Sequence, residues 1–266
     1  MDKKLNLQPM VESYNVEEEY IYLKDYLFIK GYATGRKFAY TLQALPLARK
    51  LHNGQYRKGT IEVEGIQVRV PYILHPLKVC STLMSLDLDM PDEDLDILYA
   101  CALLHDVFED TEDVFSENGI EFCTVFHFPE RVRNVVMLLS KHHGASSEEL
   151  QHYFNCIKKD PIALLIKIAD RSHNSEDLYN MKNTKKYVDE TRTYFLDHKN
   201  SLCTYGKQNY PVLSNGITIL KSKIHSLVDT TVAMLKKQDD AVKEAVEEAL
   251  KEIVKPTVPP NAASSA

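Results

Sequence analysis

The chain has 266 residues, 44% of them apolar and 26% charged, and its formal net charge of −6 excludes a basic surface over the whole chain of the kind that binds nucleic acid non-specifically. No apolar run reaches the roughly 18–20 residues of a membrane span, and residues 1–15 lack the apolar region of a signal peptide. The five cysteines are odd in number and lack a CxxC spacing, so we predict reduced thiols in a cytoplasmic protein whose partners include neither membrane nor DNA.

Helical periodicity dominates the sequence, with one interruption. Asn15 is a suitable cap for a helix over 16–29, which we expect to end at Gly31. Residues 61–63 and 66–70 flank Glu64-Gly65 and predict a β-hairpin. Apolar residues at a period of 3.6 predict the other helices, which are 37–53, 76–86, 93–107, 130–141, 147–159, 161–174, 187–205 and 217–254.

These elements predict one all-α core with helical additions at both ends. We expect an N-terminal helical extension over 1–35, a core over 36–206 and a C-terminal helical extension over 207–254. The last helix is densely charged, which indicates that one of its faces is in solvent. Residues 255–266 hold too little apolar surface to pack, so we predict a disordered tail.

Four short segments of the sequence concentrate polar and ionisable residues: HNGQYRKG at 52–59, PYILHP at 71–76, LLHDVFEDTED at 103–113 and LIKIADRSHN at 165–174. The third segment places His105 and Asp106 at the end of an apolar helix. Glu109 and Asp110 follow within one turn. His105 alone would be an ordinary helix-end residue. Buried charges are costly unless they are paired or bound to metal, however, so this density of ionisable groups predicts a site.

The fourth segment, LIKIADRSHN at 165–174, carries a polar stripe on an apolar helix. Lys167, Asp170, Arg171 and Asn174 follow the spacing i, i+3, i+4 and i+7, which places them on one helix face. Asp170 and Arg171 alone would fit a structural ion pair. A polar stripe on a buried helix predicts a cavity or a partner.

A divalent metal ion explains these positions together. His75 from PYILHP at 71–76, with His105, Asp106 and Asp170, supplies two imidazoles and two carboxylates. This ligand type suits Mn, Fe or Zn, and the absence of nearby thiolates argues against a structural zinc site. Glu109 and Asp110 are then candidates to orient or deprotonate a water molecule.

The four segments HNGQYRKG, PYILHP, HDVFED and KIADRSHN, in this order, resemble the HD-type hydrolase domain of the RelA/SpoT family over about residues 36–205. The stand-alone small alarmone hydrolases are the most similar group. The resemblance implies an HD-domain helical bundle, to which the hairpin over 59–70 is a small insertion. It also implies hydrolysis of the 3′-pyrophosphate of (p)ppGpp to GDP or GTP and pyrophosphate.

The resemblance also implies residue roles. The family's ion, usually Mn²⁺, is held at positions that match His75, His105, Asp106 and Asp170, and its hydrolytic water at those that match Glu109 and Asp110. The matching substrate-binding positions are Arg57, Lys58 and Asn174. Lys167 and Arg171 add positive charge for a polyphosphate.

The chain departs from the family pattern at Ser172, which is usually apolar, and at Asp177, where a small hydroxyl residue often helps to bind nucleotide. The departure at Asp177 removes the hydroxyl contact that the family pattern implies. The hairpin over 59–70 is expected beside the nucleotide pocket, where it would alter base preference or bind a partner, so guanosine and adenosine 3′-pyrophosphates both stay open as substrates. An alternative function is that of an antitoxin that neutralises a toxic small alarmone synthetase. It would do so by destroying the alarmone, by dephosphorylating pyrophosphorylated tRNA 3′ ends, or by direct binding. A third alternative is a general HD phosphohydrolase acting on NADPH or a 5′-nucleotide.

Overall fold

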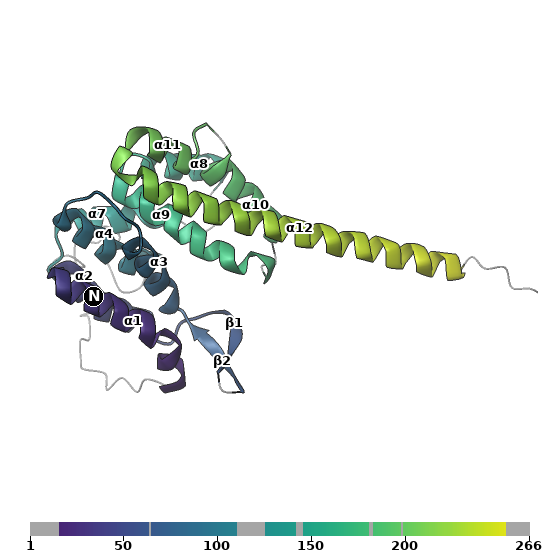
Figure 1. Cartoon of the computed structure of the whole chain (residues 1–266), viewed down its shortest axis with the longest axis horizontal. Coiled ribbons are helices and arrows are strands. Elements are labelled where there is room, and N and C mark those ends of the chain that lie inside the picture. The colour runs from purple at the N-terminus through teal and green to yellow at the C-terminus, as the bar shows by residue number, and fades with distance from the viewer. Residues whose placement is uncertain are drawn as a thin grey trace, which may run out of the picture.

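The computed structural model describes residues 16–63, 65–110, 126–141, 146–180, 183–197 and 199–253. These residues form an all-α domain with one hairpin, as predicted (Figure 1). Its first half contains α1 (Val16–Arg36), α2 (Ala39–Leu51), β1 (Tyr56–Val63), β2 (Ile66–Pro71), α3 (Leu74–Met84), α4 (Asp92–Leu104) and α5 (Val107–Asp110). Its second half contains α7 (Glu130–Leu139), α8 (Ser147–Ile157), α9 (Pro161–Asn174), a 3₁₀ turn η1 (Ser175–Asn180), α10 (Thr184–Thr191), a π turn η2 (Arg192–Leu196), α11 (Leu202–Asn209), η3 (Pro211–Leu213) and α12 (Ser214–Ile253).

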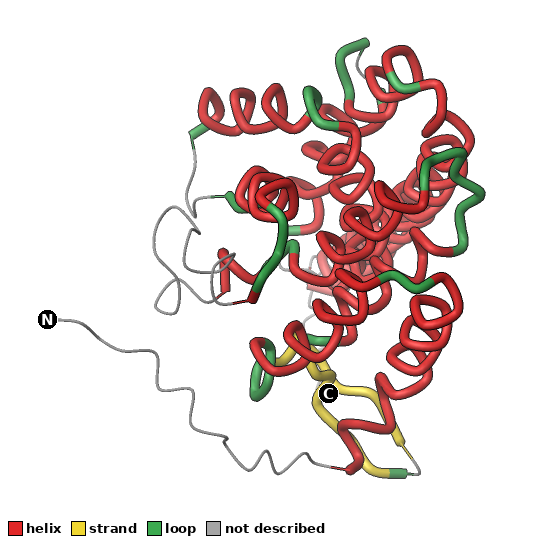
Figure 2. Tube along the Cα trace, turned by 90° about the vertical axis from the view of Figure 1, so that its left-hand side faces the viewer, coloured by secondary structure: helices red, strands yellow, loops and turns green. Residues whose placement is uncertain are grey.

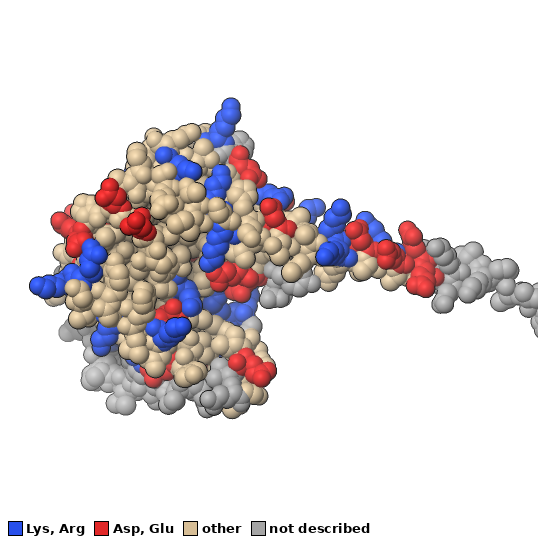
Figure 3. Space-filling view, viewed as in Figure 1, with Lys and Arg blue, Asp and Glu red and all other residues tan. Residues whose placement is uncertain are grey.

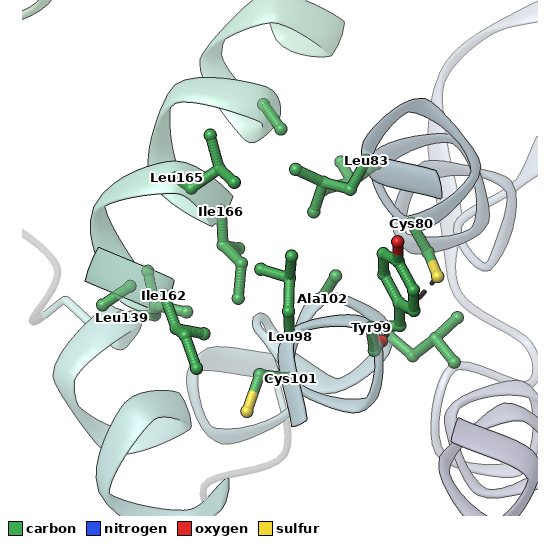
Figure 4. Packing of buried hydrophobic residues seen from close by; sticks show 14 of the residues in the cluster. Cys80, Leu83, Leu98, Tyr99, Cys101, Ala102, Leu139, Ile162, Leu165 and Ile166 are labelled. Atoms are coloured by element: carbon green, nitrogen blue, oxygen red, sulfur yellow. Dashed lines mark hydrogen bonds between the residues drawn. The ribbon is translucent and has the colours of Figure 1, made fainter. Parts of the chain in front are cut away.

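The core lies where α3, α4 and α9 meet. Side chains from these three helices point toward one another, with Leu98 of α4 between Leu83 of α3 and Ile166 of α9 (Figure 4). Cys80 and Cys101 are buried here, and the described cysteines are all free thiols, as predicted. Among the described helices, none combines the length and apolar character that a bilayer crossing requires.

Local signals fix the helix that carries most of the site. The carboxylate of Asp160 accepts hydrogen bonds from the backbone N–H groups of Ile162 and Ala163, both at 3.0 Å. Pro161 occupies the first helical turn, where its missing N–H costs nothing. The predicted bounds of this helix, 161–174, are confirmed.

Packing overrides sequence signals at two other places. The prediction that the first helix ends at Gly31 is wrong, because α1 continues to Arg36 and buries Ala33. The single helix predicted over 187–205 is also wrong. The chain forms a π turn that buries Phe195 and Leu196, and α11 then starts after Ser201, whose hydroxyl caps it.

The predicted hairpin is confirmed. Ile61 pairs with Val68 and Val63 with Ile66, and Gly65 at the tip has φ +83°, a conformation that glycine adopts without strain. The hairpin lies at one edge of the helices, with β2 against α1 (Figure 2). It leads directly into α3, so it lies beside the first residues of that helix.

The last helix has two different halves. Ile217, Leu220, Ile224 and Val228 are buried in the core, so the predicted C-terminal extension is part of the same core over its first half. From about residue 233 onward α12 projects away from the body (Figure 1). The division of the chain at 35, 206 and 254 stays a prediction, and the predicted tail at 255–266 lies outside the described residues.

Candidate metal centre

The start of α3 and the turn between α4 and α5 bring three of the candidate ligands together. His75 is in the first turn of α3, and His105 and Asp106 form the turn between α4 and α5. This turn corrects the prediction of one helix over 93–107, which the structure splits at the two ligand residues. Ligand atoms of His75, His105 and Asp106 all lie within 4.8 Å of one another.

Asp170 on α9 completes the cluster. Its Oδ1 lies 3.2 Å from His75 Nε2 and 3.9 Å from His105 Nε2. On the other side, Asp106 Oδ2 lies 3.4 Å from His75 Nε2 and 3.2 Å from His105 Nε2. The fold therefore brings together all four side chains that the sequence singled out as metal ligands.

The imidazole of His105 fits a metal ligand. Its Nδ1 lies 2.8 Å from the carbonyl oxygen of Ala102, which can only accept, so Nδ1 carries the proton and Nε2 has a lone pair. Nε2 is buried and has no hydrogen-bond partner among the described residues. Two imidazoles and two carboxylates suit a divalent ion, and the residues fit such an ion.

His173 fixes the orientation of His75. The two Nδ1 atoms lie 2.7 Å apart, so one ring donates and the other accepts. Burial, together with the positive charges of His75 and Arg57, lowers the pKa of His173 to about 2, which keeps it neutral and able to accept. His75 then donates from Nδ1, and its Nε2 faces the two carboxylates. Burial would lower the pKa of His75, but Asp106 and Asp170 raise it, so Nε2 holds a proton that a bound ion would replace.

Both carboxylates are held in place by further contacts. The Tyr72 hydroxyl donates to Asp106 Oδ2 at 2.7 Å, and the Asn174 amide donates to Asp170 Oδ1 at 2.6 Å. Lys167 Nζ lies 3.0 Å from Asp170 Oδ2. Our residue-by-residue assignment missed Tyr72 and His173, although both stand inside the segments PYILHP and KIADRSHN that carried the resemblance.

The electrostatics keep these groups charged. Burial alone would raise the pKa of Asp106 and of Asp170, but the nearby histidines, and Lys167 for Asp170, lower it below the usual range. Burial alone would lower the pKa of Lys167, and Asp170 raises it well above its ordinary value. The site therefore presents two carboxylates and one ammonium away from bulk water.

Glu109 lies on α5, beside the cluster. Its Oε1 accepts a hydrogen bond from the backbone N–H of Lys141, and its side chain is half-buried. Burial raises the pKa of Glu109, with Asp106 acting in the same direction and Lys167 against it. Asp110 ends α5, and its side chain lies outside the description.

Arg57 connects the hairpin to this cluster. Its NH2 donates to Asn174 Oδ1 at 3.3 Å and to Asp177 Oδ2 at 3.0 Å. Since Asn174 also contacts Asp170, Arg57 is two contacts from a candidate metal ligand. Lys58 is exposed on β1.

The structure separates Arg171 from the other residues of the predicted stripe. Its guanidinium carbon lies 4.1 Å from the ring centre of Tyr187 and 4.5 Å from that of Phe195, and NH1 donates to Thr191. Arg171 thus packs against α10 and η2, whereas Lys167 and Asn174 contact Asp170.

Residues 72–175, which hold the four candidate ligands, match the HD domain family. The chain is 28% identical over 168 residues to a chloroplastic protein of Oryza sativa named as a GTP diphosphokinase. It is 32% identical over 146 residues to a GTP pyrophosphokinase of Streptomyces coelicolor. It is 30% identical over 142 residues to a guanosine-3′,5′-bis(diphosphate) 3′-pyrophosphohydrolase of Haemophilus influenzae.

These matches span 59, 54 and 53% of this chain, but only 17, 15 and 19% of the length of the relatives. The activities of these longer proteins are therefore assigned to this chain only as a proposal. The four candidate ligands all lie within the residues that match the HD domain. The chain carries an HD domain with homology, over about half of the chain, to RelA/SpoT-family GTP pyrophosphokinases and ppGpp pyrophosphohydrolase.

Proposed function

We propose that the chain hydrolyses the 3′-pyrophosphate of (p)ppGpp-type alarmones, with Mn²⁺ as its ion. The HD domain and the relatives support a hydrolase. The observation that carries the finer proposal is the cluster of His75, His105, Asp106 and Asp170 inside the matched segment, with Arg57 two contacts away. In the proposed reaction, water attacks the phosphorus that is bonded to the ribose 3′ oxygen. The bond between this phosphorus and the 3′ oxygen breaks, which releases pyrophosphate and leaves a 3′-hydroxyl on the ribose.

His75, His105, Asp106 and Asp170 would hold the ion. When bound, it supplies Lewis-acid chemistry that polarises a phosphoryl oxygen and lowers the pKa of water. The chain's own contribution is to fix the donor atoms in advance. Tyr72, His173 and Lys167 are the contacts that would do so.

Glu109 is the proposed proton acceptor for the attacking water, with Asp110 beside it in the sequence. A base works best when its pKa is near the working pH, and burial moves the pKa of Glu109 upward, in that direction. Its hydrogen bond from the backbone of Lys141 would keep the second carboxylate oxygen available to the water.

Arg57, Lys58, Lys167 and Asn174 are the proposed substrate contacts. Guanidinium groups stack on purine rings and bind phosphate, and Arg57 is placed beside Asn174 for either contact. We leave Arg171 out of the proposed contacts, because its guanidinium packs against Tyr187 and Phe195. It would stabilise the orientation of α9 instead.

The test is a substrate panel of ppGpp, pppGpp, ppApp, NADPH and 3′-pyrophosphorylated tRNA, with and without Mn²⁺. We expect Mn²⁺-dependent release of pyrophosphate from ppGpp and pppGpp. Turnover of ppApp or tRNA alone would support the antitoxin function instead. Turnover of NADPH alone would support a general phosphohydrolase. No turnover of any substrate would contradict the proposal.

A matched pair of variants tests the assigned base. Glu109→Gln keeps the shape of the side chain but cannot accept the proton, so kcat should fall by about 10²–10⁴-fold. Glu93→Gln is the control, because Glu93 is exposed in the first turn of α4. Equal rates for the two variants would remove Glu109 from the mechanism.

A further inference from the structure

The projecting half of α12 exposes apolar side chains. Met234, Val242 and Val246 are 49, 58 and 53% exposed. Helices in water gain most of their stability from packing an apolar face against something else. The first half of α12 packs in this way and the second half does not (Figure 1).

Two of these residues, Val242 and Val246, continue the face that the core uses, together with half-buried Leu235. Ile217, Ile224 and Val228 are buried on one side of α12. Leu235, Val242 and Val246 follow at further steps of seven, seven and four residues, which keeps them on the same side of an α-helix. The stripe therefore runs on beyond the body as an uncovered surface, interrupted by Asp239 on the same side of the helix.

A row of four charged residues runs along the flank of this stripe. Lys236, Asp240, Lys243 and Glu247 are spaced four, three and four residues apart, so they form one line on the helix surface, with alternating signs. All four side chains are exposed. None of them forms an ion pair with another residue in the described part of the chain.

The charges of this row are complementary to those of a second, identical row that runs in the opposite direction. In an antiparallel pair of identical helices, Lys236 of each copy faces Glu247 of the other, and Asp240 faces Lys243. In a parallel pair each charge would face its like, which is unfavourable. The antiparallel register places the two-fold axis beside residues 241 and 242, so Val242 packs near its own counterpart.

We propose that the projecting half of α12 binds the same segment of a second copy of this chain as an antiparallel helix pair. The apolar stripe supplies the buried contact and the charge row sets direction and register. Basic side chains gather near the body and acidic ones toward the tip (Figure 3), an arrangement that also favours antiparallel pairing. The proposal is independent of the catalytic function.

Sedimentation of the full chain from low to high micromolar concentration tests the proposal. We expect a monomer–dimer equilibrium for the unchanged chain. Asp240→Lys/Glu247→Lys makes the row uniformly basic and should weaken the dimer at least tenfold. Glu244→Lys/Glu248→Lys makes the same charge change on the opposite face and should leave it nearly unchanged. Far-UV circular dichroism checks that each variant keeps its helix.

Rescue experiments make the test specific. Lys236→Glu/Lys243→Glu makes the row uniformly acidic, and mixing this variant with Asp240→Lys/Glu247→Lys should give a heterodimer. Reversing all four charges should restore the homodimer. A chain that stays monomeric at every concentration, or a dimer that survives both row variants, would overturn the proposal.

A cysteine placed near the proposed axis gives the direction of the pair. Under oxidation Val242→Cys should form a covalent dimer that the unchanged chain does not form, whereas Leu235→Cys should not. Cross-linking of Leu235→Cys to its own counterpart would indicate parallel pairing and would contradict the register proposed here.

Discussion

Ionisable side chains are arranged in opposite ways around α9 and on the projecting half of α12. At α9 the charges are buried and each has a close partner, such as Lys167 and Asp170 at 3.0 Å. On α12 the charges of Lys236, Asp240, Lys243 and Glu247 are exposed and form no ion pair within the described chain. Both sets are spaced at three or four residues in the sequence, so sequence spacing alone does not distinguish them.

The two arrangements differ because burying a charge costs more free energy than leaving it exposed to water. A buried charge is costly unless it is paired, so the groups near α9 hold one another in a fixed geometry, which suits metal binding and catalysis. An exposed charge costs little and an exposed pair gains little, so charges on α12 are suited to selecting a partner's direction rather than to stabilising the fold.

Asp106→Asn should affect activity most. It removes a carboxylate charge from the ligand set, and losing several kcal/mol of transition-state stabilisation lowers kcat/KM for ppGpp about 10³-fold. Asp189→Asn is the control and should keep full activity, because the side chain of Asp189 on α10 is exposed. Steady-state release of pyrophosphate measures both, and an Asp106→Asn enzyme within tenfold of the unchanged chain would contradict the site.

Lys167→Met should affect stability most. Removing one partner of a buried pair leaves Asp170 as an uncompensated charge, so the free energy of unfolding without metal should fall by about 3–5 kcal/mol. Excess Mn²⁺ should restore part of this loss by binding Asp170. Urea unfolding with chelator and with Mn²⁺ provides the comparison. Lys186→Met, which loses only an exposed pair with Glu190, should change stability by less than about 1 kcal/mol.

His173→Ala should weaken metal binding without unfolding the protein. It removes the acceptor that orients His75, and such outer contacts are typically worth about 10–100-fold in metal affinity. His173→Asn keeps a hydrogen-bond acceptor and should recover part of the affinity. Titration calorimetry with Mn²⁺ measures the three chains. Equal affinity for the unchanged and Ala chains would show that His173 does not act through His75.

Ser172→Ala should have the smallest effect, a gain in stability of about 1 kcal/mol. The Ser172 hydroxyl is fully buried and has no hydrogen-bond partner among the described residues, and an unsatisfied buried polar group is unfavourable. Urea unfolding of the two chains tests this: the midpoint should rise in the variant, while the dependence of the unfolding free energy on urea concentration stays the same. A loss of more than about 1 kcal/mol would mean that the hydroxyl has a partner in solution, such as a buried water molecule.

The sequence could predict what depends on local pattern. The bounds of α9 follow from Asp160-Pro161 and apolar periodicity, and the hairpin follows from strand residues around Glu64-Gly65. The four candidate ligands could be predicted because buried charges near one another are rare without a reason. Their contacts confirm that they cluster, although metal binding itself stays a proposal for experiment.

The remainder depends on contacts between distant parts of the chain. Tyr72 reaches Asp106 across 34 positions and His75 reaches His173 across 98, so no local pattern announces either contact. The helix spacing of Arg171 gave it the same face as Asp170, but the aromatic side chains of α10 and η2 direct its guanidinium elsewhere. The π turn at Arg192 is likewise a product of packing.

The central claim is that the cluster binds one divalent ion on which alarmone hydrolysis depends. The most direct measurement loads chelator-treated chain and its Asp106→Asn variant with increasing Mn²⁺, and follows bound metal and pyrophosphate release from ppGpp in the same samples. We predict that hydrolysis rises with the first ion bound per unchanged chain and is about 10³-fold slower in the variant. Full hydrolysis in the presence of chelator, or in the variant, would contradict the account.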